Sequence, residues 1–287
     1  SEMVVEMTSL SGVMGRYYAM HSGEGEAVAQ AIYEHTLPRF SGDELPSGLP
    51  GLVVGMADRL DSLAGLFAVG LAPSGTKDPF ALRRAALGLV QNLLAWNLDF
   101  DLRDGLTLAA ASLPVEASAE SLEQSFQFVV GRLRALLIDQ GYRYDVVDAV
   151  LAAQGQNPSA AEGAVRELSA WVSRDDWHDI LPAFARCVRI IRDQLRQYTL
   201  DPETFAEPME RDLYQALTQA EAAPRRAGSV DDFLSAFLPM IPTVNRFFDE
   251  VLVMAEDAAL RENRLALLQR VAALAKGVAD FSLLEGF

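Results

Sequence analysis

The sequence predicts an all-α protein, and three observations support that fold class. Apolar residues recur at helical spacing in most segments, as Val244, Phe247, Phe248 and Val251 do. The strict alternation of apolar and polar residues that marks half-buried strands does not occur over any comparable length. Half of the 287 residues are hydrophobic, which is enough for one large core or two medium ones.

The first part of the chain is predicted to form helices separated by Gly- and Pro-rich breaks. Met3–Val5 already have helix-like apolar character, so we expect a piece of a longer protein. A helical stripe over 26–37 stops at Pro38, because proline cannot continue a helix. A turn-rich loop follows at 41–50, and the small-residue segment 52–69 predicts a helix that is buried on most sides.

The most informative residues precede the next predicted helix, 79–96. Asp78 is expected to be its N-cap, since an Asp side chain accepts the unpaired backbone N–H groups there, and Pro79 its first residue. The N-terminus of a helix favours phosphate, so this corner is a candidate phosphate contact. It presents three cations in an otherwise acidic protein, namely Lys77, Arg83 and Arg84.

Further helices are predicted after a weaker stretch in the middle of the chain. The pattern weakens over 97–118, where acidic residues, glycine and proline interrupt it. Helices are predicted at 120–140 and 144–153, and a second compact unit is expected to start near residue 160. The last two helices have the clearest pattern, and their apolar stripe is expected to continue as far as Phe281.

The charge balance and the single cysteine exclude several classes of protein. With a net charge of −16 at pH 7, the surface as a whole does not attract nucleic acid, although a small basic patch still can. Only Lys77 and Lys276 are lysines; the many arginines suit RNA contacts, and they are equally typical of a GC-rich genome. Cys187 alone excludes internal disulfides and a cysteine metal cluster. Without a signal-peptide pattern or a long apolar run, the sequence predicts a soluble, cytoplasmic protein.

The acidic residues are compatible with metal-dependent hydrolysis or with a structural role. An active HD-type phosphohydrolase needs His ligands, a His-Asp pair and a later Asp around a metal. Asp58 is similar to that later Asp, but His21 is the only plausible upstream imidazole. The dipeptide His178-Asp179 follows Asp58 in the chain, whereas an HD-type site needs its His-Asp pair before that Asp. A structural Asp58, paired with Arg59 or a helix end, is therefore favoured, and no metal site is predicted.

No catalytic residue is predicted elsewhere in the chain. The order Gly75-Thr76-Lys77 differs from that of a phosphate-binding loop, and no predicted strand precedes it. No Ser or Cys lies in a recognisable nucleophile turn, and Cys187 is expected to be a core residue of a helix. Phe247 and Phe248 fit the apolar stripe, so we expect core packing rather than base stacking.

A set of stretches, ordered along nearly the whole chain, carries a family resemblance. In the first half they are Gly12–Ala19 with His21 and Gly23–Glu24, Leu37–Phe40 with Gly42–Asp43, Ala57–Asp61 with Gly65, and Lys77–Gly88. In the second half they are Phe247–Met254, Leu260–Leu265 and Val278–Leu284. Together they resemble the β subunit of the bacterial two-subunit glycyl-tRNA synthetase. Residues 186–191 depart from the sequence pattern of that family, which weakens any transfer of an RNA-binding role to their helix.

The resemblance implies the C-terminal part of that subunit. It implies an N-terminally truncated HD-like helical domain at 1–100, a helical linker region at 101–160 and a DALR-like anticodon-binding helical bundle at 161–287. The implied partners are tRNA(Gly) and the α subunit, in an α2β2 heterotetramer, with no membrane. ATP and Mg are used by the α subunit in glycylation, so no cofactor and no catalytic residue is expected in this fragment. The first domain would support the acceptor arm and the second would read the anticodon.

The tRNA contacts follow from the residues and the resemblance together. They are expected at Arg16, Lys77, Arg83, Arg84, Arg246, Arg261 and Arg264. Arg261 and Arg264, three residues apart, are expected to share one helix face, where neighbouring glutamates offer salt bridges as the alternative. Two other functions stay open: a metal-dependent HD-type phosphohydrolase, and a non-catalytic helical scaffold that docks another protein.

Overall fold

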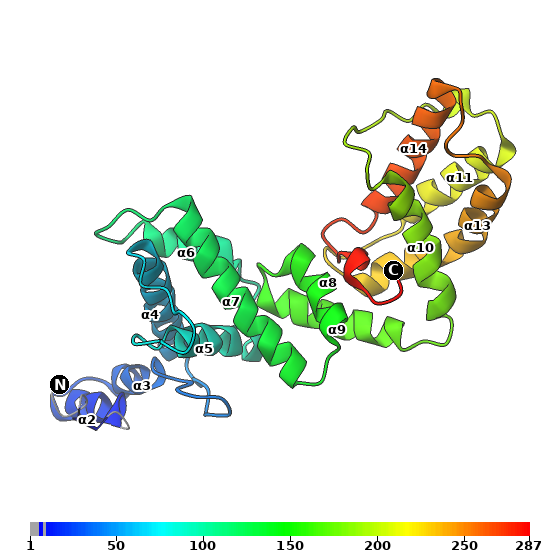
Figure 1. Cartoon of the computed structure of the whole chain (residues 1–287). Helices are drawn as coiled ribbons and strands as arrows, with labels where there is room; N and C mark the ends of the chain where they lie inside the picture. Colours follow the sequence, from blue (N-terminus) through cyan, green and yellow to red (C-terminus); the bar gives the residue numbers. More distant parts are fainter. Residues whose placement is uncertain (1–5, 8–9) are drawn as a thin grey trace. The chain divides into compact units, whose positions relative to one another are not determined.

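The computed structural model describes residues 6–7 and 10–287, which form helices joined by loops (Figure 1). The all-α prediction is confirmed, since the extended pairing within the described residues is one isolated bridge between Ser74 and Lys77. The expectation for Met3–Val5 lies outside the described residues. None of the described helices combines the length and the apolarity needed to cross a membrane.

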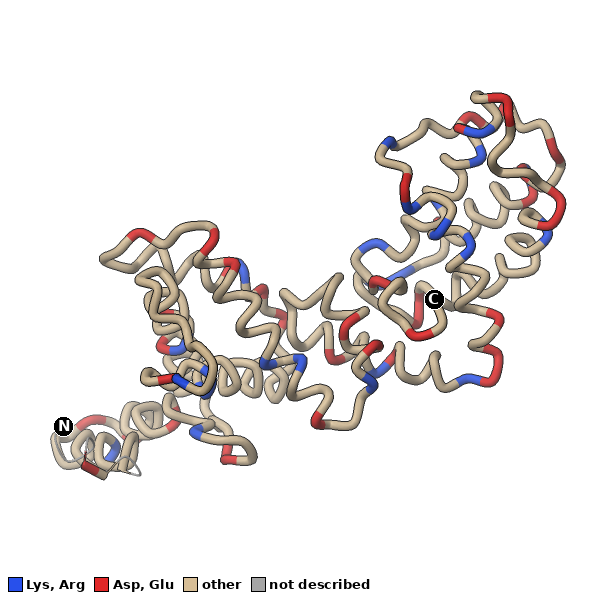
Figure 2. Tube along the Cα trace, in the orientation of Figure 1, with Lys and Arg blue, Asp and Glu red and all other residues tan. Residues whose placement is uncertain are grey.

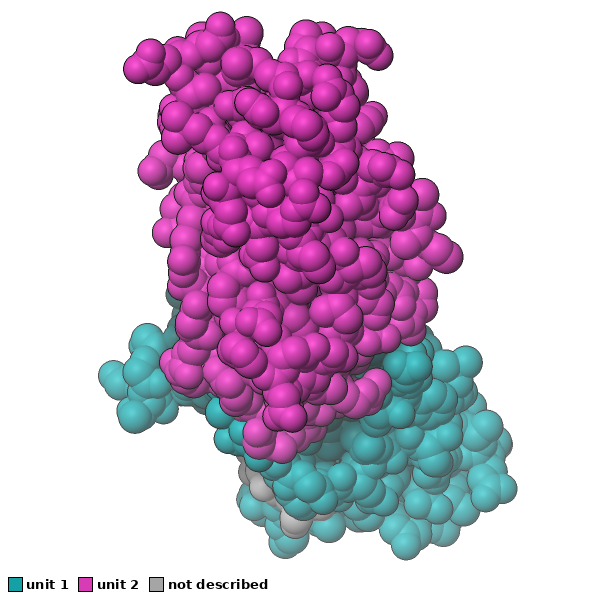
Figure 3. All heavy atoms as spheres, turned by 90° about the vertical axis from the view of Figure 1, so that its right-hand side faces the viewer, with its two compact units in different colours: residues 1–139, 156–159 teal, residues 140–155, 160–287 magenta. Residues whose placement is uncertain are grey.

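The chain folds into two compact units, which are coloured separately in Figure 3. Unit 1 comprises residues 1–139 and 156–159, and unit 2 comprises residues 140–155 and 160–287. The division into an HD-like domain, a linker region and an anticodon-binding bundle stays a prediction.

Unit 1 is built around one long central helix. Its helices are α2 (Val13–His21), α3 (Glu26–Glu34), α4 (Leu49–Ala68), α5 (Leu82–Ala95), α6 (Leu102–Ala110) and α7 (Ala119–Asp139). Helix α4 packs against α3, α5, α6 and α7, and small residues along it allow this close approach on several sides. Leu63, Leu89, Leu106 and Leu133 are completely or almost completely buried there. Removal of these apolar side chains from water stabilises the unit.

The helix predicted over 79–96 begins later than expected, at Leu82. Its N-cap is Ala81, which has a left-handed φ of 56°, so the prediction that Asp78 is the N-cap is wrong. Asp78 nevertheless caps the helix from outside it, because its carboxylate accepts hydrogen bonds from the backbone N–H groups of Leu82 (2.8 Å) and Arg83 (2.9 Å). The chain therefore makes a turn through Ala81 before the helix starts.

Helix α6 lies in the stretch where the sequence pattern weakens. Asp101 is its N-cap and accepts hydrogen bonds from the backbone N–H groups of Arg103 and Asp104. Acidic residues that interrupt the apolar pattern therefore start a helix here. The helices predicted at 120–140 and 144–153 are confirmed by α7 and by α8 (Tyr144–Gln154).

The C-terminal part of the chain is a helical bundle around an aromatic cluster. After α8 its helices are α9 (Pro158–Val172), α10 (Trp177–Ile191), α11 (Pro208–Ala222), α12 (Val230–Phe237), α13 (Ile241–Glu250) and α14 (Ala258–Ala273). The rings of Phe184, Phe233, Phe237 and Phe281 pack with centroids 5.3–6.1 Å apart. The expected stripe through Phe281 is not one helix face. Helix α14 ends at Ala273, and Phe281 packs from a separate 3-10 turn, Phe281–Leu283.

Cys187 is completely buried in α10, which confirms its prediction as a core residue. Burial raises the pKa of its thiol to about 12. Because the thiolate is the reactive form, we expect iodoacetamide at pH 8 to modify the native chain far more slowly than the chain unfolded in guanidinium chloride. Mass spectrometry over time measures both rates, with glutathione as the control thiol. Similar rates in the native and unfolded chains would contradict this burial.

Candidate nucleic-acid interface

Positive charge is dispersed among acidic residues along both units, so any nucleic-acid contact must be local (Figure 2).

The cations of the corner before α5 differ in how available they are to a ligand. The half-buried Arg83 donates a hydrogen bond from Nη2 to the carbonyl oxygen of Gly75 at 2.6 Å and so closes the loop. Lys77 and Arg84 are exposed, and neither has an ion-pair partner among the described residues. Two of the three predicted cations are therefore free to contact phosphate.

A cleft of about 760 Å³ lies beside this corner in unit 1. Its walls come from the end of α3, the loop that follows, the middle of α4 and the start of α5. Arg84 lines this cleft, and so do the two exposed aromatic side chains Phe40 (59% exposed) and Phe80 (50% exposed).

Arg59 lines the same cleft from a buried position, with 6% of the residue exposed. Its guanidinium donates hydrogen bonds to the carbonyl oxygens of residues 35–38 and of Gly55, at distances of 2.7 to 3.3 Å. Burial lowers the pKa of Arg59, and the nearby carboxylate of Asp58 opposes that shift. Carbonyl dipoles and Asp58 thus compensate this buried positive charge.

Asp58 itself is exposed and lines the cleft. Its carboxylate acts on Arg59 electrostatically, and the structural role expected for Asp58 stays a prediction. Among the described residues, no group of three or more His, Cys, Asp or Glu side chains is arranged to hold a metal ion.

Arg16 lies elsewhere in unit 1, on the exposed side of α2. Its guanidinium carbon is 5.9 Å from the centre of the Tyr33 ring.

The predicted cations of unit 2 are more strongly engaged with the protein. Arg246 is exposed on α13, where its Nε lies 3.5 Å from a carboxylate oxygen of Glu250 one turn away. Arg261 is half-buried, and its Nη1 donates a hydrogen bond to the carbonyl oxygen of Ala255 at 2.8 Å. Arg261 therefore holds the loop before α14.

Arg264 is buried, which contradicts the expectation that it shares an exposed helix face with Arg261. Only 6% of its side chain is exposed, and its Nε donates a hydrogen bond to Glu210 Oε1 at 2.8 Å. A second hydrogen bond joins its Nη1 to the carbonyl oxygen of Leu252 at 2.9 Å. Burial and these two hydrogen bonds hold the guanidinium inside the bundle, so Arg264 is not available for a phosphate.

A row of arginines on α10 and just after it was not among the predicted contacts. Arg189 and Arg192 are exposed and have no ion-pair partner among the described residues. Arg186 lies over the ring of Phe248, with its guanidinium carbon 4.6 Å from the ring centre. The three-residue spacing of Arg186, Arg189 and Arg192 is the sequence signal that could have identified this row, because such residues are neighbours on a helix. Phe247 is completely buried, as expected.

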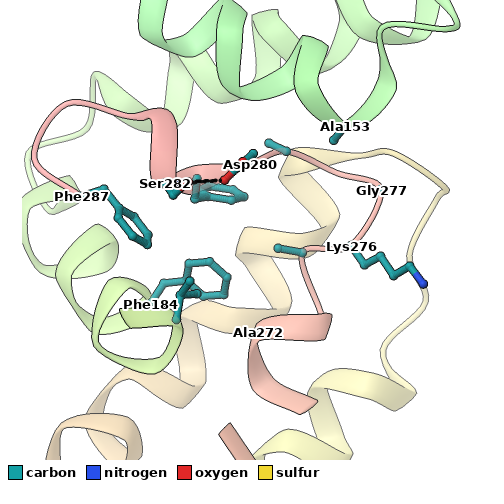
Figure 4. Close-up of a pocket in the computed structure, with 12 residues that line it drawn as sticks. Ala153, Phe184, Ala272, Lys276, Gly277, Asp280, Ser282 and Phe287 are labelled. Atoms are coloured by element: carbon teal, nitrogen blue, oxygen red, sulfur yellow. Dashed lines mark hydrogen bonds between the residues drawn. The ribbon is translucent and has the colours of Figure 1, made fainter. Parts of the chain in front are cut away.

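A smaller cavity of about 260 Å³ lies in unit 2 between residues of α10, the end of α14 and the C-terminal turn (Figure 4). Phe184 and Phe287 border it, and Ser282 Oγ donates a hydrogen bond to Asp280 at 2.6 Å. The ammonium group of Lys276 points away from the aromatic rings, so this cavity does not have the chemistry of a phosphate site.

Two family models match the chain. Residues 1–152 match the model described as glycyl-tRNA synthetase beta subunit, and residues 180–280 match the model described as DALR anticodon binding domain. The second match includes most of α10 and the exposed Arg189 and Arg192.

Curated relatives are similar over almost the whole chain. The glycine–tRNA ligase beta subunits of Moorella thermoacetica and Myxococcus xanthus are both 43% identical to it, over 98% and 99% of its length. The chloroplastic/mitochondrial glycine–tRNA ligase 2 of Arabidopsis thaliana is 40% identical over 99% of its length. The chain spans 42% of the length of the two bacterial relatives and 27% of that of the plant relative.

Proposed function

The chain belongs to the glycyl-tRNA synthetase beta-subunit family, and we propose on this premise that it is a tRNA-binding part of a glycine–tRNA ligase. It positions tRNA(Gly) for ATP-dependent glycylation, while the α subunit binds ATP and Mg²⁺ and carries out the chemistry. The observation that carries the proposal is the anticodon-binding match over 180–280, which includes the exposed Arg189 and Arg192.

The assembly and its location are part of the same proposal. The partners are tRNA(Gly) and the α subunit in an α2β2 heterotetramer, and the complex works in the cytoplasm. Unit 1 is proposed to be an HD-like helical scaffold without catalytic residues, and unit 2 an anticodon-binding bundle. No residue of this chain is assigned to the transfer of glycine.

Each unit has a local surface suited to one end of the tRNA. In unit 2, Arg189 and Arg192 can contact phosphates or stack on bases, as a planar guanidinium does. In unit 1, Lys77 and Arg84 can contact phosphates of the acceptor arm. Such contacts need only a few free cations, which reconciles tRNA binding with the net charge of −16.

Fluorescence anisotropy of the 287-residue chain with labelled tRNA(Gly), over a series of salt concentrations, tests this function. We expect binding that weakens as salt rises, because each phosphate contact releases counterions, and weaker binding when the anticodon is replaced. The variant Arg189→Ala/Arg192→Ala is expected to bind less tightly and to lower the salt slope by about 2. Arg174→Ala, which removes an exposed arginine already paired with Asp176 at 2.7 Å, is the matched control.

Absence of binding to tRNA(Gly) at low salt would contradict the proposed function and favour the protein-docking scaffold. Equal binding of the native and the anticodon-replaced tRNA would contradict anticodon recognition by unit 2.

A further inference from the structure

The cleft of unit 1 exposes two aromatic rings that pack against no other ring among the described residues. Phe40 belongs to the loop after α3, and Phe80 belongs to the loop before α5. Both line the same cleft, although they are 40 positions apart in the chain. Exposed apolar side chains gathered at one concave site are typical of a binding surface.

The loop that carries Phe40 is held in place by a charged clamp. The backbone N–H and the Nε of Arg39 both donate hydrogen bonds to Asp43 Oδ2, each at 2.8 Å. The hydrogen bond from the Arg39 guanidinium lowers the pKa of Asp43 to about 2, so the clamp is fully charged at neutral pH. The loop that carries Phe40 is therefore ordered before any ligand binds.

The loop that carries Phe80 is also held by hydrogen bonds. Asp78 accepts two backbone N–H groups of the first turn of α5, and Arg83 binds the carbonyl oxygen of Gly75. Because both loops are ordered before binding, a ligand that contacts both rings loses little free energy in arranging them.

The free charge beside the rings favours an anionic ligand. Arg84 is exposed and unpaired among the described residues, whereas carbonyl groups and the nearby Asp58 compensate the buried charge of Arg59. Arg39 is neutralised by Asp43, and Asp58 is the carboxylate that lines the cleft. Aromatic faces combined with arginine are the pattern that proteins use for unpaired nucleotides, whose bases stack and whose phosphates need cations.

We propose that this cleft binds an unpaired RNA segment, with a base stacked on Phe40 or Phe80 and a neighbouring phosphate at Arg84. Duplex RNA does not fit this pattern, because its bases already stack on one another and offer no free face. The proposal rests on the proposed function, and it adds the single-stranded character of the RNA and the two residues that stack. A cleft of about 760 Å³ is within the range of small-molecule sites.

The test compares a labelled single-stranded RNA hexanucleotide with the same strand in a duplex, by anisotropy with the 287-residue chain at low salt. Phe40→Leu/Phe80→Leu keeps apolar side chains and removes both aromatic faces. We expect tighter binding of the single strand by the wild type, and binding about 5- to 100-fold weaker by the double variant. Arg84→Ala is expected to reduce the salt slope by about 1. The control Tyr144→Leu, which removes an exposed ring of unit 2, is expected to bind like the wild type.

The outcomes separate this proposal from the function it rests on. Equal affinity of the wild type and the Phe40→Leu/Phe80→Leu variant for the single strand, with unchanged circular dichroism, would overturn the stacking proposal while tRNA(Gly) binding stands. Binding of the duplex as tight as that of the single strand would also overturn it. If the wild type binds neither the hexanucleotide nor tRNA(Gly), both the stacking proposal and the proposed function are overturned.

Discussion

Glu210→Leu is expected to lower the free energy of unfolding of the bundle in unit 2 by about 3–5 kcal/mol. The Glu210 side chain is 1% exposed and its partner Arg264 is 6% exposed, so the substitution leaves a guanidinium without its carboxylate inside the protein. The backbone N–H of Glu207, which donates a hydrogen bond to Glu210 at 2.6 Å, also loses its acceptor. Guanidinium chloride denaturation followed by tryptophan fluorescence measures the loss, since Trp171 and Trp177 lie in this unit.

A double-mutant cycle separates the buried pair from the packing around it. Arg264→Met alone is expected to be strongly destabilising, whereas Glu210→Leu/Arg264→Met is expected to be less destabilised than the sum of the two single changes. The reason is that two apolar side chains leave no unpaired charge in the interior. Arg270→Met, which breaks the exposed pair with Glu221, serves as the control and should cost less than about 1 kcal/mol. If the losses in unfolding free energy of the two single variants simply add in the double variant, Glu210 and Arg264 do not interact.

Arg59→Met is expected to destabilise unit 1 by about 2–5 kcal/mol, because buried carbonyl groups lose their hydrogen-bond donor. The guanidinium of Arg59 supplies donors to the carbonyl oxygens of residues 35–38 and of Gly55. Methionine fills similar space with an apolar chain and donates nothing. Far-UV circular dichroism during thermal unfolding measures the loss, and Arg84→Met, at an exposed position of the same cleft, is the control.

The close packing around Arg59 explains why residues 55 and 88 are glycines, and it leads to a second expected result. A Cβ atom on Gly55 would lie 2.6 Å from the carbonyl oxygen of His35 and 2.8 Å from Arg59 Nη1. A Cβ atom on Gly88 would lie 2.9 Å from Arg59 Nε. Gly55→Ala is therefore expected to be destabilising as well, since helix α4 could no longer approach the end of α3. Unchanged stability of both Arg59→Met and Gly55→Ala would contradict this account.

Local patterns in the sequence predicted most helices but misjudged where some of them start. Periodicity predicted α7 and α8, because their apolar residues recur at the helical repeat. Helix α5 starts three residues later than predicted, since the chain first turns through Ala81 in a left-handed conformation that no local rule anticipates for alanine. Asp101 followed by Asp104 is a helix start signal for α6, although the same residues interrupt the apolar pattern.

The candidate site was predicted in part. Lys77 and Arg84 are exposed cations at the predicted corner, and the family resemblance assigned from sequence stretches agrees with the two family matches. Arg264 was misjudged because Glu210, 54 positions earlier, supplies the carboxylate that holds it in the core. Phe40 was overlooked as a candidate contact because, in sequence, an isolated phenylalanine in a loop resembles any other apolar residue.

The sequence by itself therefore determined the all-α class, the division into helices and the family of this protein, because helical periodicity, capping residues and the stretches that resemble the family are local properties of the chain. The tertiary structure alone decided which cations are free and which aromatic rings face solvent. Those outcomes depend on partners such as Glu210 for Arg264, or the carbonyl groups of residues 35–38 for Arg59, which come from distant positions. Burial and pairing arise only when these segments pack together, so a charge that looks the same in sequence can stabilise the core or bind a ligand.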